Sequence, residues 1–216
     1  MRNVKVLEML NEGRIEELKA LLQDEIYEES LKTTPNARKR YTAMKKYFTY
    51  HKPARECLQK PCPVTFERKE YISFTNSWSL ALTTEKCGEI KFFDDPERYP
   101  NVTRLISFDG VKKKIDISKV IAKAKSLGYK LTKSEVNRNF KYLMKYDGSY
   151  YKIGLLDATY SIIDNGEVAM SYHRSGERGP LTLQNDIGFC IIMPVKFESD
   201  PEEDGEHVVV DVDELD

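Results

Sequence analysis

The chain has 216 residues, which suits one large domain with a smaller appendage, and 40% of its residues are hydrophobic, enough to build a core. No apolar run approaches the ~20 residues of a membrane span. The N-terminus also lacks the apolar stretch of a signal peptide. We therefore expect a cytoplasmic protein with no membrane partner. The four cysteines are too scattered for a disulfide framework, so reduced thiols are expected.

The net charge of −1 hides an uneven distribution of charge. Residues 198–216 hold ten acids and no Lys or Arg, which leaves 34 basic against 25 acidic residues, about +9, in the rest of the chain. We interpret 198–216 as an acidic, disordered tail, because residues 198–207 offer no apolar anchor. Residues 208–212 have strand character, so the extreme end could still dock on a sheet edge. The basic body suits a polyanion partner, and a purely solubilising role is the alternative.

Residues 1–60 are expected to form a helical N-terminal segment that ends in a proline-rich linker. Apolar residues recur at helical steps from Ile15 to Ile26, and Gly13 separates this helix from a shorter first one. A second helix is predicted from Asn36 to about Tyr50. Its cationic face holds five candidate DNA-binding residues, Arg38, Lys39, Arg40, Lys45 and Lys46.

Residues 61–197 read as one α+β domain. From Val64 the apolar residues alternate with polar ones, as they do in strands, and a hairpin is expected over 64–75. Asp147-Gly148 predicts a second, tight hairpin. Two packed helices are predicted near 118–128 and 155–164, the second of them short and amphipathic. Three strands follow, over 168–173, 181–185 and 189–195. Helices combined with antiparallel strands define the fold class.

Three stretches, in the right order, resemble the bacterial DNA polymerase III β sliding clamp family. Thr75-Asn-Ser-Trp-Ser-Leu-Ala is similar to the family's threonine-aspartate-glycine-histidine-arginine-leucine-alanine strand. Arg98-Tyr-Pro-Asn-Val-Thr-Arg-Leu-Ile is similar to its phenylalanine-proline-aspartate segment. The helix from Tyr151, followed by Gly179-Pro-Leu-Thr-Leu and Ile191-Ile-Met-Pro-Val-Lys-Phe, resembles the unit that closes the family's third domain with methionine-proline. The resemblance covers about residues 65–197 and implies a clamp-like domain.

The chain also departs from this family. A clamp protomer has three such domains, whereas this chain has room for one domain and a fragment. Trp78-Ser79 stands where the family has a histidine-arginine pair. The chain also continues past Phe197. The resemblance therefore implies a DNA-associated processivity or recruitment factor, from a mobile element or a reduced paralogue, that would encircle double-stranded DNA only as a homo-oligomer. The alternative is a protein-interaction adaptor that keeps the family's peptide cleft without encircling DNA.

The peptide cleft of the family binds short linear peptides of replication and repair proteins. The resemblance places that cleft in this chain at Thr75, Ser77, Trp78, Leu80, Met193, Pro194 and Val195. A Trp and a Met beside a proline also form an adaptable apolar surface on chemical grounds. The alternative is that Leu80 and Met193 are core residues covered by Trp78. We expect Trp78 to be partly exposed in a groove with Met193 and Pro194.

Clamp domains turn lysine-bearing helices toward DNA. The candidate contacts to the DNA backbone in this chain are Lys112, Lys113 and Lys114, together with Lys119 and Lys123 on the helix that follows. The alternative is that these lysines contact only solvent and form a polar helix face.

Catalytic patterns are missing from the sequence. It has neither a phosphate-binding loop nor a His-Glu-x-x-His motif. His51, His173 and His207 fall in separate regions, and Cys57 and Cys62 have no second pair with which to hold zinc. We therefore expect no enzymatic activity, no cofactor and no metal.

Overall fold

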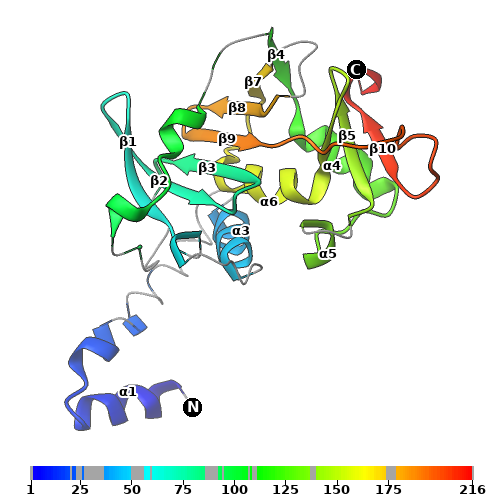
Figure 1. Cartoon of the computed structure of the whole chain (residues 1–216). Helices are drawn as coiled ribbons and strands as arrows, with labels where there is room; N and C mark the ends of the chain where they lie inside the picture. The colour runs from blue at the N-terminus through cyan, green and yellow to red at the C-terminus, as the bar shows by residue number, and fades with distance from the viewer. Residues whose placement is uncertain are drawn as a thin grey trace.

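The fold is α+β, with a large antiparallel sheet, a smaller sheet beside it and helices packed on the large sheet (Figure 1). The structure is a computed structural model that describes residues 2–19, 21–22, 26, 37–49, 56–58, 60–85, 92–93, 95–106, 108, 111–136, 140–173 and 179–215. In this part of the chain the large sheet has the order β1-β2-β3-β9-β8-β7-β4. Its strands are β1 (Cys62–Phe66), β2 (Lys69–Thr75), β3 (Ser79–Thr83), β4 (Val111–Ile115), β7 (Ala169–His173), β8 (Leu181–Asn185) and β9 (Gly188–Ile192).

The smaller sheet, of order β10-β5-β6, contains the predicted tight hairpin. Strands β5 (Tyr142–Tyr146) and β6 (Ser149–Lys152) pair antiparallel across Asp147 and Gly148, whose φ angles are +47° and +72°. A left-handed φ at both central residues is what the Asp-Gly pair favours in a two-residue hairpin, so this prediction is confirmed. Strand β10 (Val208–Asp211) pairs in parallel with the other edge of β5.

Helix α6 (Ile153–Ile163) lies at the centre of the fold, and every residue in it is buried. It packs against β3 and β9 and against α3 (Ala37–Thr49), α4 (Ile117–Ser126) and α5 (Lys133–Val136). Both predicted helices are therefore present, but the amphipathic character expected for α6 is wrong. Since neighbours surround the helix, its polar side chains bond inside the protein; Ser161, for example, donates to the Asp157 carbonyl at 2.6 Å.

Helix α3 belongs to this core. Ala43 and Met44 are 4% and 0% exposed and lie in the same apolar cluster as α6. The predicted boundary at residue 60 therefore separates α3 from the domain into which it packs. Before it, α1 (Arg2–Asn11) ends ahead of Gly13, whose φ of +69° marks the predicted break.

The face of the large sheet away from α6 carries a second apolar cluster. The segment that covers this face includes the 3₁₀ turns η2 (Pro96–Arg98) and η3 (Val102–Leu105). The buried side chains on the two sides of the contact are Cys62, Tyr71, Leu80, Leu82, Phe189 and Ile191 from the sheet, and Phe93, Tyr99 and Val102 from the covering segment. Two cores on opposite faces explain why β3 and β9 are buried at all five positions of each strand.

The tail over 198–216 is expected to be disordered, but its described residues include a strand and a 3₁₀ turn that pack on the domain. Strand β10 and the turn η4 (Val212–Glu214) bury Val210 and Val212 in the main core. At the start of the tail, the Phe197 and His207 rings contact the Phe140 ring, with centroids 6.4 and 5.6 Å away. These contacts supply the anchor that the composition of 198–207 does not reveal. None of the described helices has the length and apolar character that crossing a bilayer requires.

Candidate functional site

A groove of about 210 Å³ opens where β3 begins and β9 ends. Three separate stretches of sequence line it: residues 75–80, residues 100–105 with η3, and residues 191–193, joined by Leu58 from the turn η1 (Glu56–Leu58). The pairing of β3 with β9 brings the first and third stretches together, and the Met193 N–H donates to the Trp78 carbonyl at 3.0 Å. The volume is below the ~300–1,000 Å³ of small-molecule sites and suits a few side chains.

Apolar side chains form both the floor and the rim of the groove. Leu80, Val102 and Ile191 on the floor are 2–3% exposed. Trp78, Leu105 and Met193 on the rim are 61%, 55% and 41% exposed. Three large apolar side chains exposed beside one another are unusual on a surface that faces only water. The groove can therefore remove apolar side chains of a partner from water.

A short polar turn sets the position of Trp78. The Asn76 side-chain oxygen accepts the backbone N–H groups of Trp78 and Ser79 at 3.0 and 2.9 Å. Ser77 between them has a φ of +73°, a left-handed conformation. The Thr159 hydroxyl of α6 donates to the Ser79 hydroxyl at 2.9 Å, which ties the turn to the central helix.

Replacing Asn76 by Ala should lower the free energy of unfolding by about 1–2 kcal/mol, because the buried N–H of Ser79 and the half-buried N–H of Trp78 lose their acceptor. Asn76→Asp keeps an oxygen at that place and should retain most of the stability. Thermal unfolding of both variants, with amide hydrogen exchange at Trp78 and Ser79, measures this. Unchanged exchange in Asn76→Ala would mean that the turn does not depend on this side chain.

The groove contains five of the seven residues predicted for the cleft: Thr75, Ser77, Trp78, Leu80 and Met193. Trp78 is exposed beside Met193 as expected, whereas the buried Leu80 is also part of the second core, as the alternative reading held. The prediction is wrong for Pro194 and Val195, which line a different cavity because the chain bridges from β9 toward β6 at this point. The cleft prediction missed six lining residues: Leu58, Ser79, Pro100, Val102, Leu105 and Ile191.

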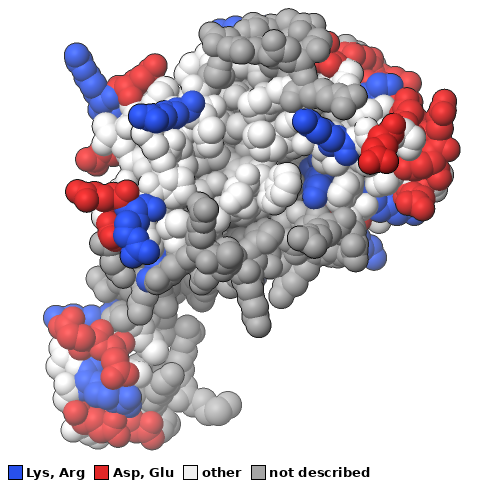
Figure 2. Space-filling model, in the orientation of Figure 1, with Lys and Arg blue, Asp and Glu red and all other residues white. Residues whose placement is uncertain are grey.

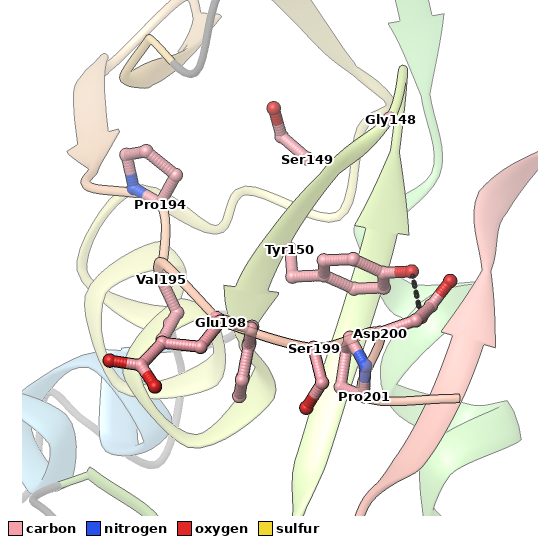
Figure 3. Close-up of a pocket in the computed structure, with 10 residues that line it drawn as sticks. Gly148, Ser149, Tyr150, Pro194, Val195, Glu198, Ser199, Asp200 and Pro201 are labelled. Atoms are coloured by element: carbon pink, nitrogen blue, oxygen red, sulfur yellow. Dashed lines mark hydrogen bonds between the residues drawn. The ribbon is translucent and has the colours of Figure 1, made fainter. Parts of the chain in front are cut away.

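The second cavity, of about 330 Å³, lies between the β5–β6 hairpin and residues 194–201 and is shown in Figure 3. The Tyr150 hydroxyl has two carboxylate acceptors for its one proton, Asp200 at 2.9 Å and Glu202 at 3.1 Å. Burial, together with these carboxylates, raises the pKa of Tyr150, so its hydroxyl stays protonated as a donor. This cavity is polar and differs in chemistry from the groove.

Lys152, on strand β6 of the smaller sheet, lies close to the Trp78 ring on the rim of the groove. Its ammonium lies 5.8 Å from the centre of the Trp78 ring and 4.2 Å from that of Phe140. Burial lowers the pKa of Lys152. The cation over both rings places a positive charge at the edge of an otherwise apolar groove.

The lysines predicted to contact DNA lie on β4 and α4. Lys112, Lys113, Lys114, Lys119 and Lys123 are all exposed. Lys112 lies over the Tyr172 ring at 5.6 Å, and Lys113 forms an ion pair with Asp213 of the tail at 2.9 Å. In Figure 2 the centre of the displayed face is largely uncharged, and acids crowd the end where β10 and the C-terminus lie.

The cations predicted on α3 have different roles. Arg40 is 5% exposed and is wrong as a DNA contact: its guanidinium donates to the carbonyls of Ile162 and Asp164 at the end of α6. Lys39 forms an ion pair with the Asp164 carboxylate at 2.7 Å. Arg38 is exposed, and the side chains of Lys45 and Lys46 lie outside the described residues. Two cations of this face, Lys39 and Arg40, therefore bind groups at the C-terminal end of α6.

Within the described residues, His, Cys, Asp and Glu side chains do not gather into a group of three that could hold a metal. Cys62 and Cys190 are buried free thiols, and burial raises the pKa of both. A buried thiol with a raised pKa is a poor nucleophile and a poor metal ligand.

Comparison with known proteins gave no match: neither a protein-family model, nor a curated protein, nor a solved structure is similar enough to this chain to assign it to a family.

Proposed function

We propose that this chain is a non-enzymatic, clamp-like binding protein whose groove holds an apolar peptide segment of a partner protein. One observation carries the proposal: stretches 75–80, 100–105 and 191–193 each belong to a motif of the clamp resemblance, and all three line one groove with an apolar rim. Stretches that lie 20 or more positions apart in the sequence thus form one surface, as the resemblance implies for the peptide cleft, and this supports the proposal.

The turn before Trp78 gives further support. Asn76 and Ser77 occupy the positions of the family's aspartate and glycine. Asn76 accepts two backbone N–H groups, which an aspartate would do equally well. Ser77 has the positive φ that favours glycine. Asn76 and Ser77 therefore occupy backbone positions that an aspartate and a glycine would also suit.

Selection from a randomised peptide library on the full-length protein tests the proposal. We expect enrichment of peptides with large apolar side chains, and loss of their binding in Met193→Glu, which puts a charge on the rim. Val168→Glu is the matched control, since Val168 is 47% exposed and does not line the groove. Equal loss in both variants, or no enriched peptide, would count against a peptide groove.

DNA binding is a second candidate function, favoured by the exposed lysines of α4. Lys119 and Lys123 are one helical turn apart and therefore lie on the same face of the helix. Phosphate contacts require only such charges and do not depend on base sequence. Encirclement of DNA would need an oligomer, so light scattering on the eluting protein separates a ring from an adaptor that works as a monomer.

Any DNA binding should be weak, independent of sequence and steeply reduced by salt. The double variant Lys119→Gln/Lys123→Gln should lower both the affinity and the salt slope, by roughly one unit of slope for each phosphate that the protein no longer neutralises. The control Arg68→Gln/Lys69→Gln removes the same charge at the β1–β2 hairpin, at the far end of the sheet from β4. Identical slopes for the two double variants would place the DNA site away from α4.

A further inference from the structure

The acidic tail crosses the molecule beside its lysines. Strand β10 lies between β5, to which it is hydrogen-bonded, and α4, with which it is in contact. Val210 and Val212 of the tail share the core with Val120 and Ile121 of α4. Helix α4 therefore lies next to the part of the tail that carries Asp211 and Asp213.

Three tail acids form ion pairs with two lysines of the strands. Lys145 on β5 pairs with Glu202 at 2.6 Å and with Asp211 at 3.7 Å. Lys113 on β4 pairs with Asp213 at 2.9 Å. One of these lysines, Lys113, is a predicted DNA contact. Carboxylates thus sit at cations that could otherwise hold phosphate oxygens.

The contacts are suited to release. The ion pairs are on the surface, where each contributes little and is weakened by salt. Of the four residues in β10, Val210 is the one that is fully buried. The strand is thus held by a short ladder, by the burial of Val210 and by charge, and a polyanion can compete for the last of these.

We propose that residues 198–215 are an intramolecular occupant of a cationic surface formed by Lys113 and Lys145 beside α4, and that the phosphate backbone of nucleic acid competes with them for it. The proposal rests on the second candidate function, DNA binding. The proposal adds a regulated state. When the tail is docked, its acids partly neutralise the cationic surface. When the tail is displaced, Lys113 and Lys145 add their charges to those of the α4 lysines.

Two triple variants test this, and both remove three negative charges from the full-length chain. In the first, Glu202→Gln/Asp211→Asn/Asp213→Asn, the altered acids form the ion pairs. In the second, Glu203→Gln/Glu206→Gln/Glu214→Gln, the altered acids are exposed and make no ion pair with a described residue. The readouts are the anisotropy of a labelled random-sequence DNA duplex at low salt and amide hydrogen exchange over Val208–Asp211.

We expect the first triple variant to bind the duplex about tenfold more tightly than the second, with the difference shrinking at high salt. Adding the duplex to the unaltered protein should also speed exchange over β10. Equal affinity of both variants would overturn the competition while leaving DNA binding intact. Absence of duplex binding in all three proteins would overturn DNA binding and the competition together.

Discussion

Arg40→Ala is expected to lower the free energy of unfolding by about 3 kcal/mol. The guanidinium is buried and donates to the Ile162 carbonyl at 3.0 Å and the Asp164 carbonyl at 3.2 Å, and it pairs with Glu85 at 3.3 Å. Its removal leaves two carbonyls at the end of α6 without this donor and opens a cavity between α3 and α6. Chemical denaturation of the variant measures the loss.

The matched control is Arg38→Ala, on the same helix but exposed, which should change stability by less than about 0.5 kcal/mol. Arg40→Lys should recover only part of the loss, because one ammonium cannot reproduce the planar fork that spans two carbonyls and a carboxylate. Similar stabilities for Arg40→Ala and Arg38→Ala would show that α3 is not fastened to α6 through this side chain.

The second large effect concerns the groove. Trp78→Ala should weaken the binding of a selected apolar peptide by about 2 kcal/mol or more, roughly thirtyfold in Kd, since a large aromatic side chain that a partner covers often carries much of the binding energy. The stability of the fold should change little, because Trp78 is 61% exposed. Anisotropy of the labelled peptide gives the Kd, and thermal unfolding checks the fold. Unchanged affinity would remove Trp78 from the site.

Local patterns predicted much of the fold. The Asp147-Gly148 hairpin follows from turn chemistry that acts within a few residues, and strands β7 to β9 follow from short apolar runs bounded by turns. The burial of α6 on all sides could not be predicted in this way. Its small and polar residues indicated an exposed face, whereas α3, more than a hundred positions earlier, covers it.

The same limit applies to the tail and to the cations. The acids of 198–216 indicated disorder, but two valines, the ring contacts of Phe197 and the lysines of β4 and β5 hold the tail in place. Arg40 looked like its neighbours on α3, and only the packing of that helix shows which cation points inward. Long-range contacts decide such cases, and a charge pattern does not contain them.

In the groove, Thr75, Ser77, Trp78, Leu80 and Met193 were predicted because the resemblance supplied their pairing. Leu105 was missed, although its segment belongs to the resemblance, because nothing local shows that η3 lies across the end of β3. Leu58 precedes the domain predicted from the sequence and had no signal. Pro194 and Val195 were assigned because the methionine-proline end of the family lines its cleft, but in this chain they line the second cavity.

The most direct measurement is NMR of the protein with ¹³C-labelled methionine methyl groups, titrated with a selected apolar peptide. The chain has one Trp and six Met, so the indole N–H of Trp78 and the Met193 methyl can be assigned by substitution. If the peptide occupies the groove, these two signals move together and saturate with the same Kd, while the buried Met44 and Met144 methyls stay in place. Saturable binding that leaves both Trp78 and Met193 unmoved would contradict the groove as the binding site.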